Sequence, residues 1–257
     1  MILALDIGNS NIVVYGLEND NVIFSGRMKT DKNESTEDIA GHIDFILKLN
    51  SVNKNAFEGA VISSVVPCIN DRSAGAVRKL IGKKPLIAGK TADFGLNIRM
   101  DNPQKVGEDM LVDTVAALSK YEPPMLIFDI GTASTCSVID KDGSYIASII
   151  APGVMISLKA LSDNTAKLPK IKLEAPKGIL AKNTEESMKS GIVYGNAAMI
   201  DGIADRIFDE LGYDAKIIAT GGLSCLIVPH CKHEIIYEPD LLAQGLGILW
   251  EKNKKNV

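Results

Sequence analysis

The sequence predicts an α/β protein built from two similar halves, each with a mixed sheet flanked by helices. Apolar strand-like segments alternate with amphipathic helical segments along the chain, which is typical of this class. One strand–turn–strand pattern occurs twice, beginning at Met1 and again at Met125. A single repeat at half the chain length indicates a duplicated domain rather than a solenoid. Because a proline-containing stretch at 121–124 separates the copies, we expect domains at residues 1–121 and 122–257.

The repeated pattern is an apolar strand that ends in Asp, a tight turn with Gly and small polar residues, and a second strand. The first copy reaches Asp6 and turns at residues 8–11, and the second reaches Asp129 and turns at residues 131–134. Asp-Ile-Gly occurs in both copies, and the two aspartates are 123 residues apart. The two halves are therefore expected to begin with the same hairpin.

The remaining elements of the first half follow from hydrophobic periodicity. Asn19-Asp20-Asn21 is a turn signal between two strands, and Thr36 precedes a segment with apolar residues at helical spacing. A buried strand further on contains the small polar residues Ser63 and Ser64. The expected strands are 12–17, 22–27, 59–65 and 84–88, and the expected helices are 39–47, 71–81 and 107–120.

The second half repeats this alternation after its hairpin. Gly191 and Gly195 interrupt an otherwise helical pattern, so residues 182–211 are expected to form one or two helices. A glycine pair, Gly221-Gly222, follows the last expected strand and precedes a short helix. The expected strands are 145–151 and 216–220, the expected longer helices are 154–162 and 240–252, and residues 253–256 are expected to fray.

Composition excludes several classes of protein. With 46% hydrophobic and 23% charged residues, the chain is neither disordered nor fibrous. Its net charge of −4 gives no overall field for nucleic acid or anionic lipid, so neither is an expected partner. No stretch approaches the roughly 18 apolar residues that span a bilayer. The first residues predict a strand rather than a signal peptide, and we expect a cytoplasmic protein.

The four cysteines predict no disulfide framework. Cys68, Cys136, Cys225 and Cys231 form no Cys-x-x-Cys pair, so buried free thiols in a reducing compartment are expected. His230, Cys231 and His233 crowd together, but no fourth ligand at suitable spacing accompanies them. The sequence therefore does not favour a tetrahedral metal site at this position.

The repeated turns have a chemical use. Backbone N–H groups of a glycine turn can point at phosphate oxygens, and a strand-end Asp can hold a hydrated Mg²⁺ that bridges them. Two such turns, with Gly221-Gly222 after a third strand, indicate a nucleotide held between the two halves. The residues also allow a simpler explanation, in which Asp6 and Asp129 only form turns and the glycine pair binds no ligand.

The arrangement resembles the superfamily of sugar kinases, heat-shock chaperone ATPases and actin, whose duplicated domains are ribonuclease H-like. Several runs narrow the resemblance to type III pantothenate kinases, and it extends from residue 6 to about 249. The runs are Asn102-Pro103-Gln104-Lys105-Val106-Gly107-Glu108-Asp109 with Asp113-Thr114-Val115-Ala116-Ala117, Asp129-Ile130-Gly131-Thr132-Ala133, Ala151-Pro152-Gly153 with Thr165-Ala166-Lys167-Leu168-Pro169, and Asn183-Thr184 with Gly191 and Gly195.

The resemblance implies transfer of the γ-phosphoryl group of ATP to the primary hydroxyl of pantothenate, the first step of coenzyme A synthesis. It makes Asp109 the catalytic base and Asp129 the ligand of a monovalent cation, K⁺ or NH₄⁺, and it implies a homodimer. Asp6 would lie near Mg²⁺. The implied ATP and phosphate contacts are Asp6, Ile7, Gly8, Asn9, Ser10, Asn11, Ile12, Val13, Thr132, Gly221 and Gly222. The implied substrate contacts are Met100, Gly107, Glu108, Asp109, Met110 and Thr184.

Three of these positions also have structural explanations. Asp109 can be an acidic residue in the first turn of a helix, Gly107 a turn residue, and Thr184 an N-cap. A capping role and a ligand contact are compatible for Thr184.

The chain departs from the family pattern at three places. Met110 stands where the family has Arg, Met100 where it commonly has Tyr, and Ala147-Ser148 where it has two glycines. Arg is a permanent cation suited to an anionic substrate, and Met supplies no charge. Two alternatives to pantothenate phosphorylation therefore stay open here: a kinase of the same fold for another small alcohol, and a non-catalytic nucleotide-binding regulatory protein.

Overall fold

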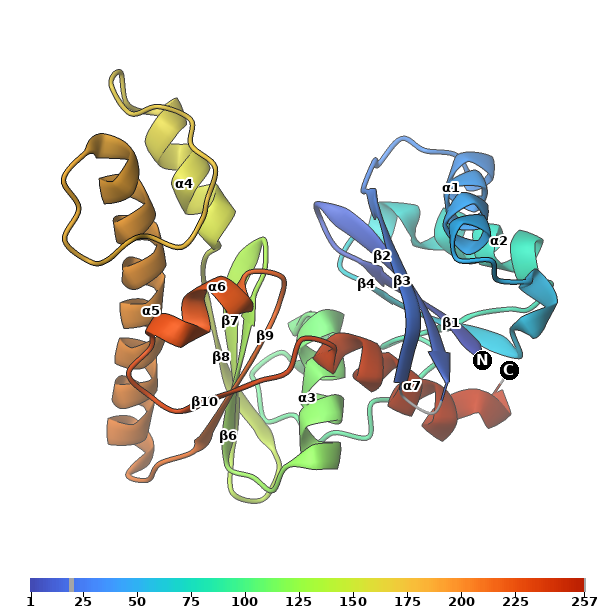
Figure 1. Cartoon of the computed structure of the whole chain (residues 1–257). Helices are drawn as coiled ribbons and strands as arrows, with labels where there is room; N and C mark the ends of the chain where they lie inside the picture. Colours follow the sequence, from blue (N-terminus) through green and yellow to red (C-terminus); the bar gives the residue numbers. More distant parts are fainter. Residues whose placement is uncertain (19–20, 257) are drawn as a thin grey trace. The chain divides into compact units, whose positions relative to one another are not determined.

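The computed structural model describes residues 1–18 and 21–256. The chain forms two compact units. The first contains Met1–Leu96, Asn102–Lys120 and Asp240–Val257, and the second contains Asn97–Asp101 and Tyr121–Pro239 (Figure 1). The chain passes from the first unit to the second at Lys120–Tyr121, and its C-terminal segment is part of the first unit. The expected turn at Asn19–Asn21 falls largely outside the described residues.

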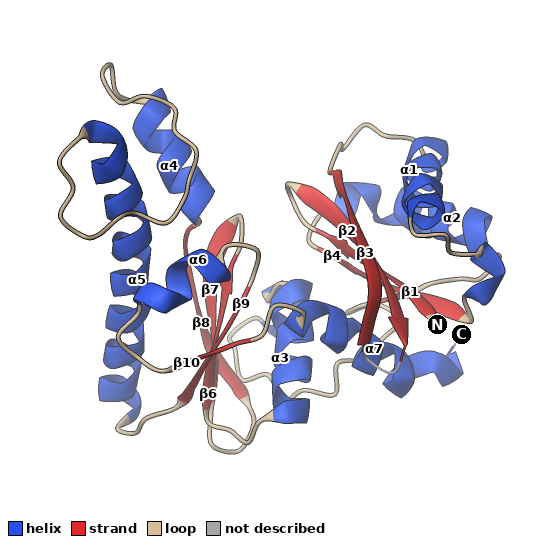
Figure 2. Cartoon of the chain, in the orientation of Figure 1, coloured by secondary structure: helices blue, strands red, loops and turns tan. Residues whose placement is uncertain are grey.

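The first unit has a mixed five-stranded sheet in the order β3-β2-β1-β4-β5 (Figure 2). β1 pairs antiparallel with β2 and parallel with β4, and β2 pairs antiparallel with β3. The mixed sheet predicted for this half is confirmed. The strands are β1 (Ile2–Ile7), β2 (Asn11–Glu18), β3 (Asn21–Lys29), β4 (Gly59–Ser64) and β5 (Leu86–Ile87).

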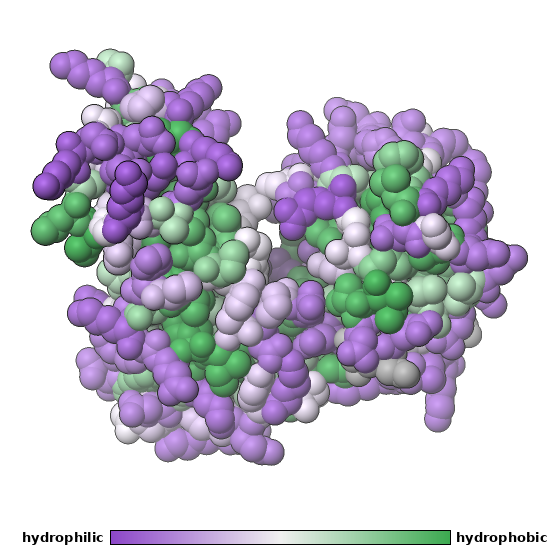
Figure 3. All heavy atoms as spheres, in the orientation of Figure 1, coloured by the Kyte–Doolittle hydropathy of each residue, from purple (hydrophilic) through white to green (hydrophobic). Residues whose placement is uncertain are grey.

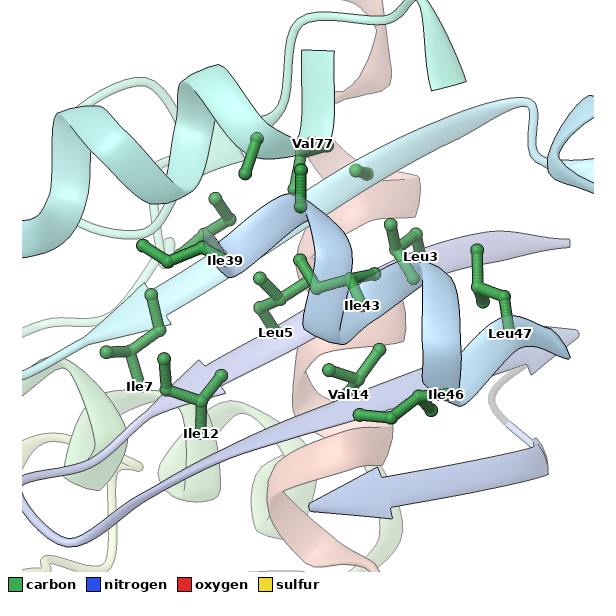
Figure 4. Packing of buried hydrophobic residues seen from close by; sticks show 14 of the residues in the cluster. Leu3, Leu5, Ile7, Ile12, Val14, Ile39, Ile43, Ile46, Leu47 and Val77 are labelled. Carbon is green, nitrogen blue, oxygen red and sulfur yellow. The ribbon is translucent and has the colours of Figure 1, made fainter. Parts of the chain in front are cut away.

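Helices α1 (Thr36–Leu49) and α2 (Asn70–Ile81) form the main hydrophobic core on one face of this sheet. Side chains on the inner face of α1 pack onto Leu5 of β1 and Val14 of β2, with Val77 of α2 beside them (Figure 4). Ser35 caps α1 because its hydroxyl accepts the N–H of Asp38, whose carboxylate accepts the N–H of Ser35 in return. This core fixes the strand ends that bear the first turn.

Helices α3 (Glu108–Lys120) and α7 (Leu241–Asn253) pack together and contact the first sheet. A Cβ at Gly245 would lie 2.3 Å from the carbonyl oxygen of Val112, so only glycine lets the two helices approach this closely. Trp250 of α7 occupies the space above Gly59 of β4. These contacts explain why the last helix belongs to the first unit.

The expected fraying at residue 253 is wrong. Asn253 is buried, its side-chain oxygen accepts the N–H of Asp93, and its side-chain amide donates to the carbonyls of Asp93 and Leu249. The helix end is therefore held by side-chain hydrogen bonds.

The second unit repeats the strand order of the first. Its sheet has the order β10-β9-β6-β7-β8, in which the first hairpin strand is central, as β1 is in the first unit. The duplication predicted from the repeated hairpin is thus visible in the topology. The strands are β6 (Met125–Ile130), β7 (Ala133–Ile139), β8 (Tyr145–Pro152), β9 (Lys216–Thr220) and β10 (Ile235–Tyr237).

The helices of the second unit are α4 (Val154–Asp163), α5 (Thr184–Leu211) and the short α6 (Ser224–Ile227). Residues 184–211 form one helix, and a Cβ at Gly191 or Gly195 would meet no atom within 4 Å, so these glycines do not interrupt it. The second core lies between α5 and the sheet, with Phe128 and Ile217 among its residues. Short 3₁₀ helices occupy Lys54–Ala56, Pro67–Ile69, Pro103–Lys105, Val228–His230 and Lys254–Asn256.

All four cysteines are free, but only Cys136 is fully buried. Cys68 and Cys225 are exposed, so the expectation of buried thiols is wrong for them. Among residues 1–18 and 21–256, no helix combines the length and the apolar character needed to cross a bilayer.

Candidate active site

Asp6 lies at the carboxyl end of β1, between Val13 of β2 and Ser63 of β4. The turn that follows is closed by a hydrogen bond from the N–H of Gly8 to the carbonyl of Asn11 (3.0 Å). Asn9 and Ser10 are exposed at its tip. The first predicted phosphate loop is therefore a tight, solvent-facing turn with a half-buried carboxylate at its base.

The residues around this turn either pack in the core or anchor the turn by hydrogen bonds. Ile7 and Ile12 are completely buried in the core between the sheet and α1 (Figure 4), so only their backbone groups are available to a ligand. Thr30, which the sequence analysis missed, fixes the turn from the outside. Its hydroxyl donates to the carbonyl of Gly8 (2.7 Å) and its N–H to the carbonyl of Ser10 (3.1 Å). These two hydrogen bonds hold the turn in one conformation. They use only carbonyl groups of the turn, so they occupy none of its N–H groups.

The second turn has the same base and is one residue shorter. Asp129 pairs with Thr135 of β7 and Thr220 of β9, and the N–H of Gly131 donates to the carbonyl of Ala133 (3.1 Å). Thr132 is exposed at the tip. The carboxylate and the tip residue thus occupy the same places as Asp6 and the tip of the first turn.

Glycines crowd around Asp129. Gly221 has φ +93°, and a Cβ there would lie 2.3 Å from Oδ1 of Asp129 and 2.6 Å from the backbone nitrogen of Ile130. A Cβ at Gly153 would collide with the carbonyl of Thr132, at 2.0 Å. Gly221 and Gly153 therefore let two other chain segments approach the turn that follows Asp129. Gly222 is exposed beside Gly221.

Asp109 lies in the first turn of α3 and folds back over Gly107. A Cβ at Gly107 would lie 2.5 Å from its Oδ1, which accepts the N–H of Met110 at 2.8 Å. Burial raises the pKa of the Asp109 carboxyl, and the backbone N–H groups of Met110 and Asp109 offset this only in part. The neighbouring Glu108 is half-buried against Gly89. A half-buried carboxylate whose pKa is raised is a better proton acceptor than an exposed helix acid.

Charged groups gather on the sheet face that bears Asp6. Burial raises the pKa of the Tyr15 hydroxyl on β2, and the negative charges of Asp6, Asp240 and Asp113 add to the effect while Arg27 opposes it. These groups come from three strands, from α3 and from the residue preceding α7. The cluster could not be predicted from the sequence, because its members are far apart in the chain.

The remaining predicted substrate contacts have different surroundings. Met110 is 7% exposed, so its side chain is buried in the first unit. Met100 is half-buried in the second unit. Thr184 is exposed at the start of α5 but is not the N-cap, because Asn183 caps the helix by accepting the N–H of Glu186 (2.9 Å). The capping explanation for Thr184 is therefore wrong.

The predicted residues divide between the units. The first unit brings together Asp6 to Val13 and holds residues 107–110, and the second brings together Asp129, Thr132 and Gly221. Near the histidines, the Nε2 of His233 lies 2.8 Å from Asp205 and the ring of His230 packs edge-on against Tyr194. Within the described part of the chain, no group of three or more His, Cys, Asp or Glu is placed to hold a metal ion.

Comparisons with known proteins cover almost the whole chain. A family model described as type III pantothenate kinase matches residues 2–206. A type III pantothenate kinase from Exiguobacterium sp. is 37% identical over 255 residues, which are 99% of this chain and 100% of that protein. One from Agathobacter rectalis is 37% identical over 259 residues, with full coverage of both chains.

Solved structures share the fold at much lower identity. A 2-dehydro-3-deoxygalactonokinase protein from Sinorhizobium meliloti superposes with a TM-score of 0.63 and 11% identity, covering 98% of this chain and 96% of that one. An activator of 2-hydroxyisocaproyl-CoA dehydratase from Clostridium difficile, solved with bound ADPNP, gives a TM-score of 0.59 and 10% identity, covering 99% and 96%. These likenesses and the repeated sheet order confirm the predicted fold, in which two mixed five-stranded sheets are each flanked by helices as in the actin-like and sugar kinase ATPase fold.

Proposed function

The chain belongs to the type III pantothenate kinase family, and from this we propose that it transfers the γ-phosphoryl group of ATP to the primary hydroxyl of pantothenate. The product is 4'-phosphopantothenate, and the reaction is the first step of coenzyme A synthesis. The observation that carries the proposal is the full-length relationship to proteins of that name. The full-length relationship does not favour the two alternatives that the departures at Met110 and Met100 left open, a kinase for another small alcohol and a non-catalytic regulator. We expect the protein to act in the cytoplasm.

We assign the proton transfer to Asp109. As the hydroxyl oxygen of pantothenate forms its bond to the γ-phosphorus and the bond to ADP breaks, Oδ1 or Oδ2 of Asp109 accepts the hydroxyl proton. The half-buried position of Asp109 suits it to this task, since partial burial raises the pKa of its carboxyl. Gly107 allows the carboxylate to fold back over the start of the helix.

The first turn, from Asp6 to Val13, is assigned to the phosphates of ATP. Its exposed tip residues and fixed backbone suit the binding of phosphate oxygens by N–H groups. Asp6 is half-buried at its base, beside the buried hydroxyl of Ser63, which has no hydrogen-bond partner among the described residues. These oxygen groups fit a hydrated Mg²⁺. When bound, Mg²⁺ would neutralise negative charge on the phosphates of ATP.

We assign a monovalent cation, K⁺ or NH₄⁺, to Asp129. The glycines at 131 and 221 leave the carboxylate surrounded by backbone, with a Cβ at Gly221 excluded by the 2.3 Å approach to Oδ1. A carboxylate among backbone groups fits an oxygen-seeking cation. Thr132 and Gly222, exposed beside this carboxylate, are assigned to ATP, and Thr184, Met100, Glu108 and Met110 to the substrate side.

A homodimer is part of the proposal. The second unit exposes large apolar side chains on β8, on α4 and on the segment that connects α4 to α5, and hydrophobic residues lie among hydrophilic ones on the surface of this unit (Figure 3). Exposed large apolar side chains are the surface that an interface between subunits would bury. The exposed residues are Ile150, Met155, Ile156, Leu161, Ile179 and Leu180.

The test is an assay of ADP release by the purified full chain with ATP, Mg²⁺ and K⁺, with and without pantothenate. We expect ADP release that depends on pantothenate and a phosphorylated pantothenate in the mass spectrum. Replacing K⁺ by Na⁺ is expected to lower the rate. ADP release that is equal with and without pantothenate would overturn the proposed acceptor.

A further inference from the structure

Ser63 and Asp6 are register partners on the adjacent parallel strands β4 and β1. Register partners in a sheet direct their side chains to the same face, so the Ser63 hydroxyl and the Asp6 carboxylate emerge side by side. Ser63 is completely buried, and its Oγ has no hydrogen-bond partner among the described residues. A hydroxyl without a partner thus lies next to the carboxylate at the base of the first turn.

The neighbouring Ser64 shows what a structural serine looks like at this strand end. Its hydroxyl donates to the side chain of Asn70 (2.5 Å) and accepts the N–H of Val66 (3.1 Å), which joins β4 to α2. Because successive side chains alternate, Ser63 points to the opposite face, the one on which Gly59 meets Trp250 of α7. The Ser64 hydroxyl is therefore hydrogen-bonded within the fold, whereas the Ser63 hydroxyl has no structural role among the described residues.

A buried hydroxyl without a partner is unfavourable for folding, because it has lost its hydrogen bonds to water. At a position of this size an alanine would pack without that penalty. The second unit has the same pairing, since Thr220 of β9 is the register partner of Asp129 and is also buried. A hydroxyl residue thus lies beside the strand-end carboxylate in both halves, and in the first half that hydroxyl has no hydrogen-bond partner among the described residues.

We propose that the Ser63 hydroxyl accepts a hydrogen bond from a water molecule of the hydrated Mg²⁺ that Asp6 holds, and so positions the metal–ATP complex. Ser63 is then a positioning residue that acts through the metal's hydration shell. The inference rests on the proposed assignment of Asp6 to Mg²⁺. Mg²⁺ keeps several of its waters and takes few protein ligands, so groups that bind those waters decide where it lies.

The test measures binding of Mn²⁺ with ATP to the full chain by electron paramagnetic resonance, using Ser63→Ala. We expect the dissociation constant for Mn²⁺–ATP to rise about tenfold, as for other groups that bind a metal's ligands indirectly. Affinity for ATP in EDTA and the melting temperature of the free protein are expected not to fall, because Ala removes an unsatisfied group. Ser63→Thr, which keeps the hydroxyl, is expected to restore Mn²⁺–ATP binding.

Ser73→Ala is the matched control. Ser73 on α2 is also completely buried and also lacks a partner among the described residues, but it has no strand-end carboxylate as a register partner. We expect it to leave Mn²⁺–ATP binding unchanged. Wild-type affinity in Ser63→Ala, or equal losses of affinity with Mn²⁺ and in EDTA, would overturn the role of Ser63.

Asp6→Asn tests the assignment of Mg²⁺ to Asp6 separately from the role of Ser63. If Asp6→Asn weakens Mn²⁺–ATP binding and Ser63→Ala does not, the assignment of Asp6 survives and the role of Ser63 is wrong. If Asp6→Asn binds Mn²⁺–ATP as the wild type does, the metal assignment of Asp6 is wrong, and the role of Ser63 fails with it.

Discussion

Gly107 and the carboxylate of Asp109 lie so close that a Cβ on the glycine would be 2.5 Å from Oδ1. The same oxygen accepts the N–H of Met110, so the carboxylate is held across the beginning of α3. An ordinary acid in the first turn of a helix extends into solvent and is stabilised by the helix dipole. Asp109 is instead drawn inward, which is the geometry expected of a proton acceptor in a site.

Asp109→Asn is expected to lower kcat about 10²- to 10⁴-fold, because the amide cannot accept the hydroxyl proton. Affinity for ATP should change little, since Asp109 is assigned to the acceptor. Asp71→Asn is the control: Asp71 is exposed in the first turn of α2 and has only a helix-dipole role. The measurement is steady-state ADP release. If both variants keep full activity, Asp109 is only a helix acid.

The pH dependence of kcat/KM should report the raised pKa of Asp109. The base must be ionised, so activity is expected to fall on acidification with a midpoint above the ordinary Asp value of about 3.9. The profile of Asp109→Asn should lack this limb. A limb with the same midpoint in both proteins would assign it to another group.

The raised pKa of Asp109 also makes the stability of the fold depend on pH, in the direction opposite to activity. The unfolded chain loses the Asp109 proton at its ordinary pKa and the folded chain loses it at a higher one. Between the two values the folded state binds more protons, so its contribution to stability falls as pH rises. At neutral pH, where the penalty is fully present, the Asn variant should unfold at higher urea concentration than the wild type.

Gly221→Ala is expected to destabilise the protein by about 3 kcal/mol or more, because the new Cβ would combine strain at φ +93° with a collision against Asp129 and Ile130. Gly212→Ala is matched in backbone, with φ +73°, but nothing lies within 4 Å of its Cβ. It should cost only about 1–2 kcal/mol. Urea unfolding measures both, and equal losses would show that the space beside Asp129 is open.

The K⁺ concentration for half-maximal activity completes this comparison. It should rise in Gly221→Ala and stay unchanged in Gly212→Ala, because only the first variant alters the surroundings of the Asp129 carboxylate. An unchanged K⁺ requirement in folded Gly221→Ala would contradict the cation assignment.

The duplicated fold could be predicted from the sequence because its signals are local. Hydrophobic periodicity fixes each element, and the repeated hairpin ending in Asp6 and Asp129 marks the two sheet centres. That α7 belongs to the first unit could not be predicted, because periodicity shows that a helix buries one face but not which sheet this face covers. The reasons, Gly245 against Val112 and Trp250 over Gly59, are contacts between distant segments.

The site was predictable to a similar extent. The glycine turns follow from sequence, but Thr30 and Ser63 become site neighbours only through strand pairing. The N-cap of α5 was misassigned by one residue because Asn183 and Thr184 are both good capping residues. Exposure of Cys68 and Cys225 was missed because local apolar composition does not report which face of a short helix is covered.

Met110→Arg is expected to destabilise the protein by about 3 kcal/mol or more, since a guanidinium would replace an apolar side chain that is 7% exposed and would lose most of its hydration. Met110→Leu, a change of similar volume, should cost less than about 1.5 kcal/mol. Urea unfolding measures both. Unchanged stability together with a lower KM for pantothenate in Met110→Arg would show instead that this side chain reaches the substrate.

Leu180→Asp is expected to convert a dimer into a monomer. Leu180 is 90% exposed, the carbonyl of the preceding Ile179 accepts a hydrogen bond from Ser190 of α5, and this bond holds the segment in place before association. If Leu180 is buried in the proposed dimer, a carboxylate in its place would lose its hydration there. Leu49→Asp on α1 of the first unit, where Leu49 is 68% exposed, is the control and should leave the mass unchanged. Light scattering after gel filtration gives the masses. A wild-type monomer, or a dimer that survives Leu180→Asp, would place the association surface elsewhere or remove it from the proposal.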